Sequence, residues 1–151
     1  AIMGDYLQKQ NRYKESYAAY DSCLQYKNDN IYCMNNYAYY LSINGGDLKK
    51  AEQMSFKTVQ AEPKNATYLD TYAWILFMQK RFTEAKIYVD QAIKNDTDSV
   101  LNSVILEHAG DIHAQLGDTK TALYYWHKAL KLGSGNTAIL EKKIRLKKYI
   151  K

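Results

Sequence analysis

The sequence predicts an all-α protein built from stacked pairs of antiparallel helices. Three observations lead to this class: a four-residue pattern recurs four times, its leading residues lie 34, 35 and 37 positions apart, and the 151 residues include one proline and seven glycines. Repetition at such a period is the signature of helical arrays in which each unit packs on its neighbours. Few prolines and glycines fit long helices joined by short loops.

The recurring pattern marks where two helices must come close together. It consists of a small residue, a second small residue 12 or 13 positions later, a packing residue four positions further on, and a last small residue three beyond that. Ser55 is the weakest of the packing residues. The four quartets are Gly4–Ser16–Tyr20–Cys23, Ala38–Ala51–Ser55–Thr58, Ala73–Ala85–Val89–Ala92 and Gly110–Ala122–Trp126–Ala129.

Polar and glycine-containing segments divide the chain into units. Because glycine, asparagine and aspartate favour turns and helix caps, we expect the units to span about 1–29, 30–64, 65–97 and 98–134. Pro63 closes the second unit just past a helix end. The segments that set these boundaries and the turns inside the units are Asn28-Asp29-Asn30, Asn44-Gly45-Gly46-Asp47, Asn95-Asp96-Thr97-Asp98, Gly117-Asp118 and Gly133-Ser134-Gly135.

Residues 136–150 are predicted to form one further helix that caps the array. Ile139, Leu140, Ile144 and Tyr149 give it an apolar face, and lysines cover the other. At the other end, the sequence opens at Ala1, part-way through an expected helix. We therefore expect a fragment of a longer chain, with any targeting segment upstream. The sequence does not indicate a compartment; the bacterial cytoplasm and the cell envelope both fit it.

The net charge of +5 comes from one terminal segment. Residues 1–140 hold 15 basic and 15 acidic side chains, whereas 141–151 hold six basic and one acidic. We expect a solvated outer face of the capping helix, which disfavours nucleic acid as a partner; a patch for nucleic acid or anionic lipid is the alternative. The six basic residues are Lys142, Lys143, Arg145, Lys147, Lys148 and Lys151.

No pattern in the sequence indicates catalysis, a cofactor or a metal. His108 and His113 are five positions apart, on different helix faces, unlike a metal-binding pair at i, i+4. Phosphate-binding loops and nucleophile motifs are absent from the sequence. Cys23 occupies a small-residue slot, so a buried thiol is expected; a disulfide with Cys33 is the alternative and needs an oxidising compartment.

The quartets resemble those of the tetratricopeptide repeat family across nearly the whole chain. Gly110, Ala122, Trp126 and Ala129 match best, and the stretch Tyr68–Trp74 is similar to bacterial members. The resemblance implies a right-handed superhelix of about four helix pairs, an α-solenoid. It also implies a concave groove, lined by the first helix of each pair, that binds an extended peptide or a partner protein.

Helical spacing indicates which side chains would face that groove. If Tyr37, Ala38 and Leu41 pack on the partner helix, other positions of the first helices face the hollow. We expect a surface that is aromatic in the middle and acidic along one side, which suits a partner with apolar and basic side chains. The alternative is that Trp74 and Phe77 pack between units. The predicted groove residues are Tyr32, Asn35, Tyr39, Thr67, Asp70, Trp74, Phe77, Glu107 and Asp111.

The function predicted from these patterns is that of a protein–protein interaction scaffold or adaptor, with no enzymatic activity. Affinity would come from aromatic burial and charge complementarity along the groove. One alternative is a structural component of a bacterial envelope or secretion assembly. A second is an anionic partner bound by the basic C-terminal helix. The sequence identifies neither the partner nor the oligomeric state.

Overall fold

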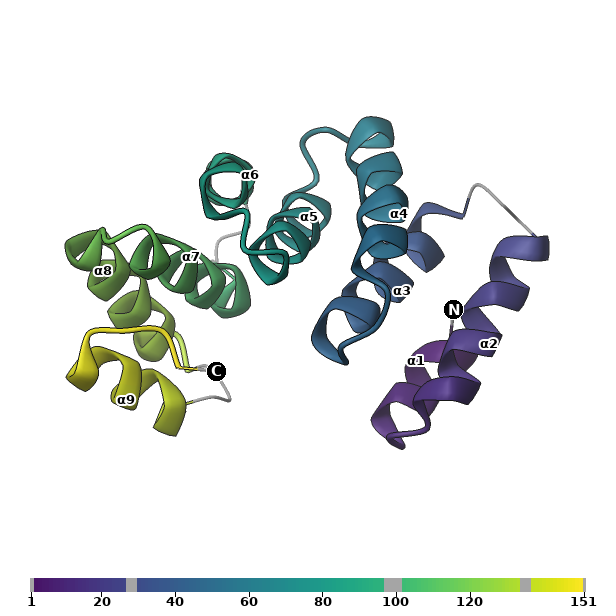
Figure 1. Cartoon of the computed structure of the whole chain (residues 1–151), viewed down its shortest axis with the longest axis horizontal. Coiled ribbons are helices and arrows are strands. Elements are labelled where there is room, and N and C mark those ends of the chain that lie inside the picture. The colour runs from purple at the N-terminus through teal and green to yellow at the C-terminus, as the bar shows by residue number, and fades with distance from the viewer. Residues whose placement is uncertain (1, 27–29, 97–101, 134–136, 151) are drawn as a thin grey trace. The chain divides into compact units, whose positions relative to one another are not determined.

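A computed structural model describes residues 2–26, 30–96, 102–133 and 137–150 of the chain (Figure 1). These residues form nine α-helices and no strand. The chain divides into two compact units, unit 1 over Ala1–Pro63 and unit 2 over Lys64–Lys151. The predicted boundary residues Asn28, Asp29, Thr97, Asp98, Ser134 and Gly135 lie outside the described residues.

Unit 1 consists of two helix hairpins. Helix α1 (Ile2–Lys9) pairs with α2 (Tyr13–Tyr26), and α3 (Ile31–Ile43) pairs with α4 (Leu48–Ala61). Helix α3 also contacts α1 and α2, so the two hairpins pack on each other.

Unit 2 consists of two further hairpins and a last helix. Helix α5 (Ala66–Met78) pairs with α6 (Phe82–Asn95), and α7 (Ser103–Gln115) pairs with α8 (Thr119–Lys131). Helix α7 contacts both α5 and α6, and α9 (Thr137–Leu146) packs against α8. The limits of the four repeat units stay a prediction.

The quartet residues form the seam of each hairpin, as predicted. In the hairpin α5/α6, Ala73, Ala85, Val89 and Ala92 are all fully buried. Cys23 is the exception, being only half-buried. Both cysteines are free, and burial raises the pKa of the Cys33 thiol to about 12.

The first and third residues of each quartet complement each other in size. A Cβ atom added at Gly110 would lie 2.3 Å from Cδ1 of the buried Trp126. One added at Gly4 would lie 2.6 Å from Cε1 of Tyr20. Where the first residue is alanine, the third is the smaller Val89 or Ser55. The two helix backbones can therefore approach closely in every hairpin, because a large ring faces a glycine and a smaller side chain faces an alanine.

The first helix of every hairpin ends in the same kind of turn. A residue with left-handed backbone angles follows the helix: Asn11 (φ 57°), Gly45 (φ 73°), Lys80 (φ 63°) or Gly117 (φ 81°). The next amide then donates to a carbonyl five residues earlier, as Arg81 N does to Leu76 O at 2.9 Å. This is a Schellman-type end, which satisfies carbonyl groups that the helix leaves unpaired.

Asparagine and aspartate cap the following helices. Asn30, Asp47, Asn65 and Asn102 each accept a hydrogen bond from an amide in the first turn of α3, α4, α5 and α7, respectively. Asp118 does the same for α8. Such caps satisfy amide groups that have no partner inside the helix, so the polar joints fix where each helix begins.

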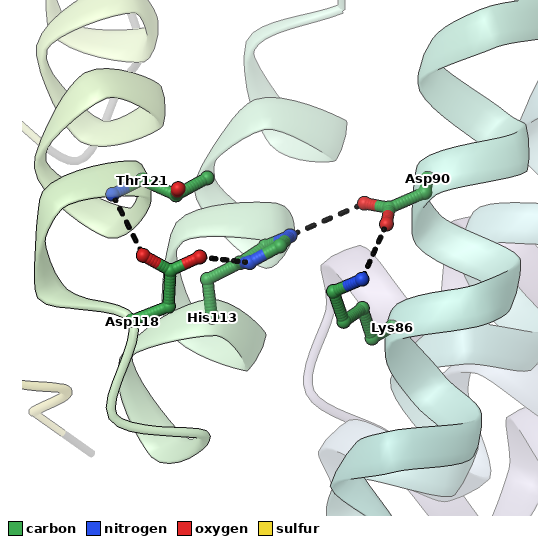
Figure 2. A network of polar contacts seen from close by, with 5 residues as sticks. All are labelled: Lys86, Asp90, His113, Asp118 and Thr121. Atoms are coloured by element: carbon green, nitrogen blue, oxygen red, sulfur yellow. Dashed lines mark hydrogen bonds and ion pairs between the residues drawn. The ribbon is translucent and has the colours of Figure 1, made fainter.

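His113 ties the two hairpins of unit 2 together (Figure 2). Its Nε2 lies 3.2 Å from Asp90 Oδ1 on α6, and its Nδ1 lies 3.4 Å from Asp118 Oδ2 at the start of α8. Asp90 is also paired with Lys86, and Asp118 accepts a hydrogen bond from Thr121 N. One buried imidazole therefore lies between two carboxylates from different hairpins.

Helix α9 is shorter and faces differently than predicted. It ends at Leu146, not near residue 150, and Ile139 is exposed while Leu140 and Lys143 are buried. Leu140 packs into a cluster with Leu106, Ala122 and Trp126. Because Lys143 lies one turn after Leu140, it points inward as well. Lys143 therefore does not belong to the predicted solvated basic face.

We predict that Gly110→Ala destabilises unit 2 by about 2 kcal/mol, because the added methyl group meets the fixed Trp126 ring. In a Trp126→Val background, which reproduces the Ala73/Val89 pair, the same change should be neutral or stabilising because alanine favours a helix. Urea unfolding followed by tryptophan fluorescence measures both, since Trp74 and Trp126, the two tryptophans of the chain, lie in unit 2. Equal effects of Gly110→Ala in the two backgrounds would show that the pair is not coupled.

We also predict opposite effects for two buried serines on second helices. Ser55 Oγ has no hydrogen-bond partner among the described residues, so Ser55→Ala should stabilise unit 1 by about 1 kcal/mol. Ser16 Oγ donates to Gly4 O at 2.7 Å and accepts from Gln8 Nε2 at 2.9 Å, so Ser16→Ala should cost a similar amount. Urea unfolding followed by circular dichroism compares them; loss of stability in Ser55→Ala contradicts the assignment.

Candidate functional site

The predicted groove residues of unit 1 differ in exposure. Tyr32 is exposed, Tyr39 is half-buried and Asn35 is buried. The hydroxyl of Tyr32 donates to Asp5 Oδ2 at 3.1 Å, and Asn36 Nδ2 donates to both Asp5 oxygens at 3.2 Å. These contacts join α1 to α3 within unit 1.

In unit 2 the predicted residues come together on one face. We define the first-helix face of unit 2 as two groups of side chains. The first group lies on α5 and α7 at helical spacing, and the second consists of the residues on α9 and just after it that touch the first group. Thr67 and Val104 are exposed at its rim, and Asp70, Trp74, Phe77 and Asp111 are buried. The residues of this face are Thr67, Asp70, Trp74, Phe77, Val104, Glu107, His108, Asp111, Lys143 and Tyr149.

Aromatic rings form a stack through this face. The Trp74 ring lies parallel to His108 with centroids 4.0 Å apart, and parallel to Phe77 at 4.5 Å. The Tyr149 ring, from the segment after α9, contacts Phe77 edge-on at 5.0 Å. Trp74 thus packs between α5 and α7, where it adds offset-stacking energy to the burial of apolar area.

Asp70 is paired with a histidine from the neighbouring hairpin. His108 Nδ1 lies 2.9 Å from Asp70 Oδ1 and 3.0 Å from Oδ2, and both side chains are buried. Burial acts to lower the pKa of His108, but the Asp70 carboxylate outweighs it and raises that pKa above 6.5. The pair holds α5 to α7 beside the Trp74 ring.

Asp111 and Glu107 are paired with a lysine of the last helix. Lys143 Nζ lies 2.8 Å from Asp111 Oδ1 and 2.9 Å from Glu107 Oε2. Trp126 Nε1 donates to the same Asp111 oxygen at 3.0 Å. Burial raises the pKa of Asp111 to about 6 against the opposing effect of Lys143. The pKa of Lys143 is raised above 10.5, because the two carboxylates outweigh burial.

The face is therefore acidic, but its carboxylates have basic partners from the same chain. Sequence reasoning placed Asp70, Glu107 and Asp111 on this face and missed His108, Lys143 and Tyr149. Lys143 gave one usable signal: it follows Leu140 by three residues and so shares its apolar side. Among the described residues, no group of three or more histidine, cysteine or acidic side chains is arranged to hold a metal ion.

Solved structures with a similar arrangement of helices identify the fold. The chain is similar to MamA (TM-score 0.72, 17% identity, covering 97% of this chain and 77% of MamA). It is also similar to Pseudomonas aeruginosa PilF (0.76, 21%, covering 96% and 67%). A third similar structure, YrrB, is described as a tetratricopeptide protein with an unusual peptide-binding site (0.68, 19%, covering 85% and 64%). The chain has the tetratricopeptide-repeat fold.

This result confirms the predicted fold class, an all-α array of helix hairpins of the solenoid type. The sequence itself matches no family model and no curated protein. In the part of the chain that the structure covers, no helix combines the length and the hydropathy needed to cross a bilayer.

We predict that unit 2 loses stability as pH rises from about 4 through neutral pH. Asp111 has a folded pKa above its ordinary 3.8, so the folded state binds more protons between pH 4 and 6. His108 adds stability below pH 6.5 that is lost as pH rises through its raised folded pKa. Asp90 and Asp118 have lowered pKa values, so their contribution to the stability is lost mainly below pH 3.8, outside this range. We expect a fall of about 3 kcal/mol, most of it from Asp111.

Urea unfolding at a series of pH values, followed by tryptophan fluorescence, tests this prediction. Asp111→Asn is the matched variant because it keeps an oxygen for Trp126 Nε1 but does not titrate. Its stability should fall less between pH 4 and 6 than that of the wild type. A wild-type stability that rises over this range contradicts the assignment.

Proposed function

We propose that this protein is a repeat scaffold that binds a segment of a partner protein on the first-helix face of unit 2. The observation that carries the proposal is the composition of that face. Trp74 and Phe77 form its buried aromatic interior, three carboxylates lie on the same face, and Thr67 and Val104 form an exposed rim. Aromatic residues in a partly desolvated site are the usual energetic centre of a protein interface.

The fold supports this proposal. First helices in such arrays line the surfaces that repeat proteins use for binding. The similar structure YrrB is described by its peptide-binding site. The mechanism is recognition without chemistry, and the acidic balance of the face favours a segment that carries apolar and basic side chains.

A pair of exposed aliphatic residues allows a test that leaves the packed interior intact. Val104 is 45% exposed on α7, one turn before Glu107, and Ile87 is 53% exposed on α6, a second helix. We predict that Val104→Arg weakens binding of a partner segment at least tenfold, because it adds bulk and positive charge at the rim. Ile87→Arg adds the same side chain elsewhere and should leave the affinity unchanged.

The measurement uses peptides selected from a displayed random library on the full chain. Their dissociation constants are determined by fluorescence polarisation against the wild type and both variants, at two salt concentrations. A library that gives no binder, or binders that tolerate Val104→Arg, would refute the proposal. Binding that falls steeply with salt and is lost in Arg145→Glu would place the site on the exposed basic side of α9 instead.

A further inference from the structure

The segment after α9 folds back onto the first-helix face. Helix α9 ends at Leu146, and Lys147 takes left-handed backbone angles with φ 58°. Lys148 N then donates to Lys143 O at 3.3 Å, which reverses the chain direction. This is the turn that ends the first helix of every hairpin, but here it leads an irregular segment toward α5.

Tyr149 is the residue of this segment that reaches the face. Its ring meets Phe77 edge-on at 5.0 Å and lies under the Lys143 ammonium, 5.3 Å from Nζ. Burial raises the pKa of its hydroxyl, and Asp111 adds to the effect. An aromatic side chain from outside the hairpins thus occupies the Phe77 end of the aromatic stack, close to the carboxylates of α7.

We infer that residues 147–150 act as an internal ligand, and that a partner segment with an aromatic side chain beside lysine or arginine displaces Tyr149 from Phe77. This inference rests on the proposed function, and it specifies both the partner chemistry and its regulation. The tail itself supplies the pattern, since Lys147 and Lys148 precede Tyr149. The basic residues suit the acidic balance of the face.

An internal ligand sets a threshold for binding. A short tether holds the tail at an effective concentration on the order of millimolar, so a guest must compete with it. The turn at Lys147 is not optimal, because left-handed angles disfavour residues that carry a Cβ atom. The backbone cost at Lys147 lowers the free energy that a guest must supply to open the closed arrangement, and weak guests are excluded.

The test uses a labelled peptide copy of residues 144–151, IRLKKYIK, and a control, IRLKKAIK, against the full chain. Tyr149→Ala empties the position, and Tyr124→Ala is the matched control because Tyr124 is 58% exposed on α8. We expect the tyrosine peptide to bind Tyr149→Ala at least tenfold more tightly than the wild type or Tyr124→Ala. The alanine peptide should bind none of them.

A second variant, for which the opposite change in peptide affinity is expected, strengthens the test. Lys147→Gly relieves the backbone at the turn and keeps Tyr149, so it should bind the peptide more weakly than the wild type. Equal binding of both peptides to all variants, or no binding to Tyr149→Ala at millimolar peptide, would overturn the inference. If library-selected peptides still bind and lose affinity in Val104→Arg, that failure concerns the tail alone and the proposed function stands.

Discussion

The close approach of two helices inside each hairpin is the constraint on which the rest of the structure depends. Gly110 makes room for Trp126, and Gly4 makes room for Tyr20. With a side chain larger than hydrogen at Gly110, the Trp126 ring must move. Its Nε1 would then lose Asp111, the residue that holds Lys143 and through it α9. A steric rule inside one hairpin is thus connected by hydrogen bonds to the candidate site.

Local signals predicted the hairpins well. The quartets, the polar caps and the turn glycines all act within about 20 residues, so that spacing and propensity suffice to read them. Asn30 and Asp47 cap helices where the polar joints were expected. The left-handed turn at Lys80 carries no such signal, because lysine rarely adopts these backbone angles. Its position follows only from the repeat register.

The pairing of charges in the site could not be read in the same way. Asp70 and His108 are 38 residues apart, and Glu107 and Lys143 are 36 apart. Charged residues on a first-helix face are consistent with an open acidic surface, and the partners that neutralise them lie on other helices. Leu140 is informative in retrospect. It lies seven residues before the left-handed Lys147. The residues at the same distance from the other four turns are small: Gly4, Ala38, Ala73 and Gly110. A large residue in that register packs against α7 and α8, and it carries Lys143 inward with it.

Neutralised carboxylates also change what the face selects. An open acidic surface would attract any basic segment at long range, and salt would weaken the attraction. Here a guest cation must compete with Lys143 for Glu107 and Asp111, and separating that buried lysine from them leaves charges without partners. Charge alone is therefore insufficient for binding. A guest also has to supply apolar contact at Phe77, where Tyr149 now lies, so the aromatic residue of a partner contributes more to specificity than its basic neighbours do.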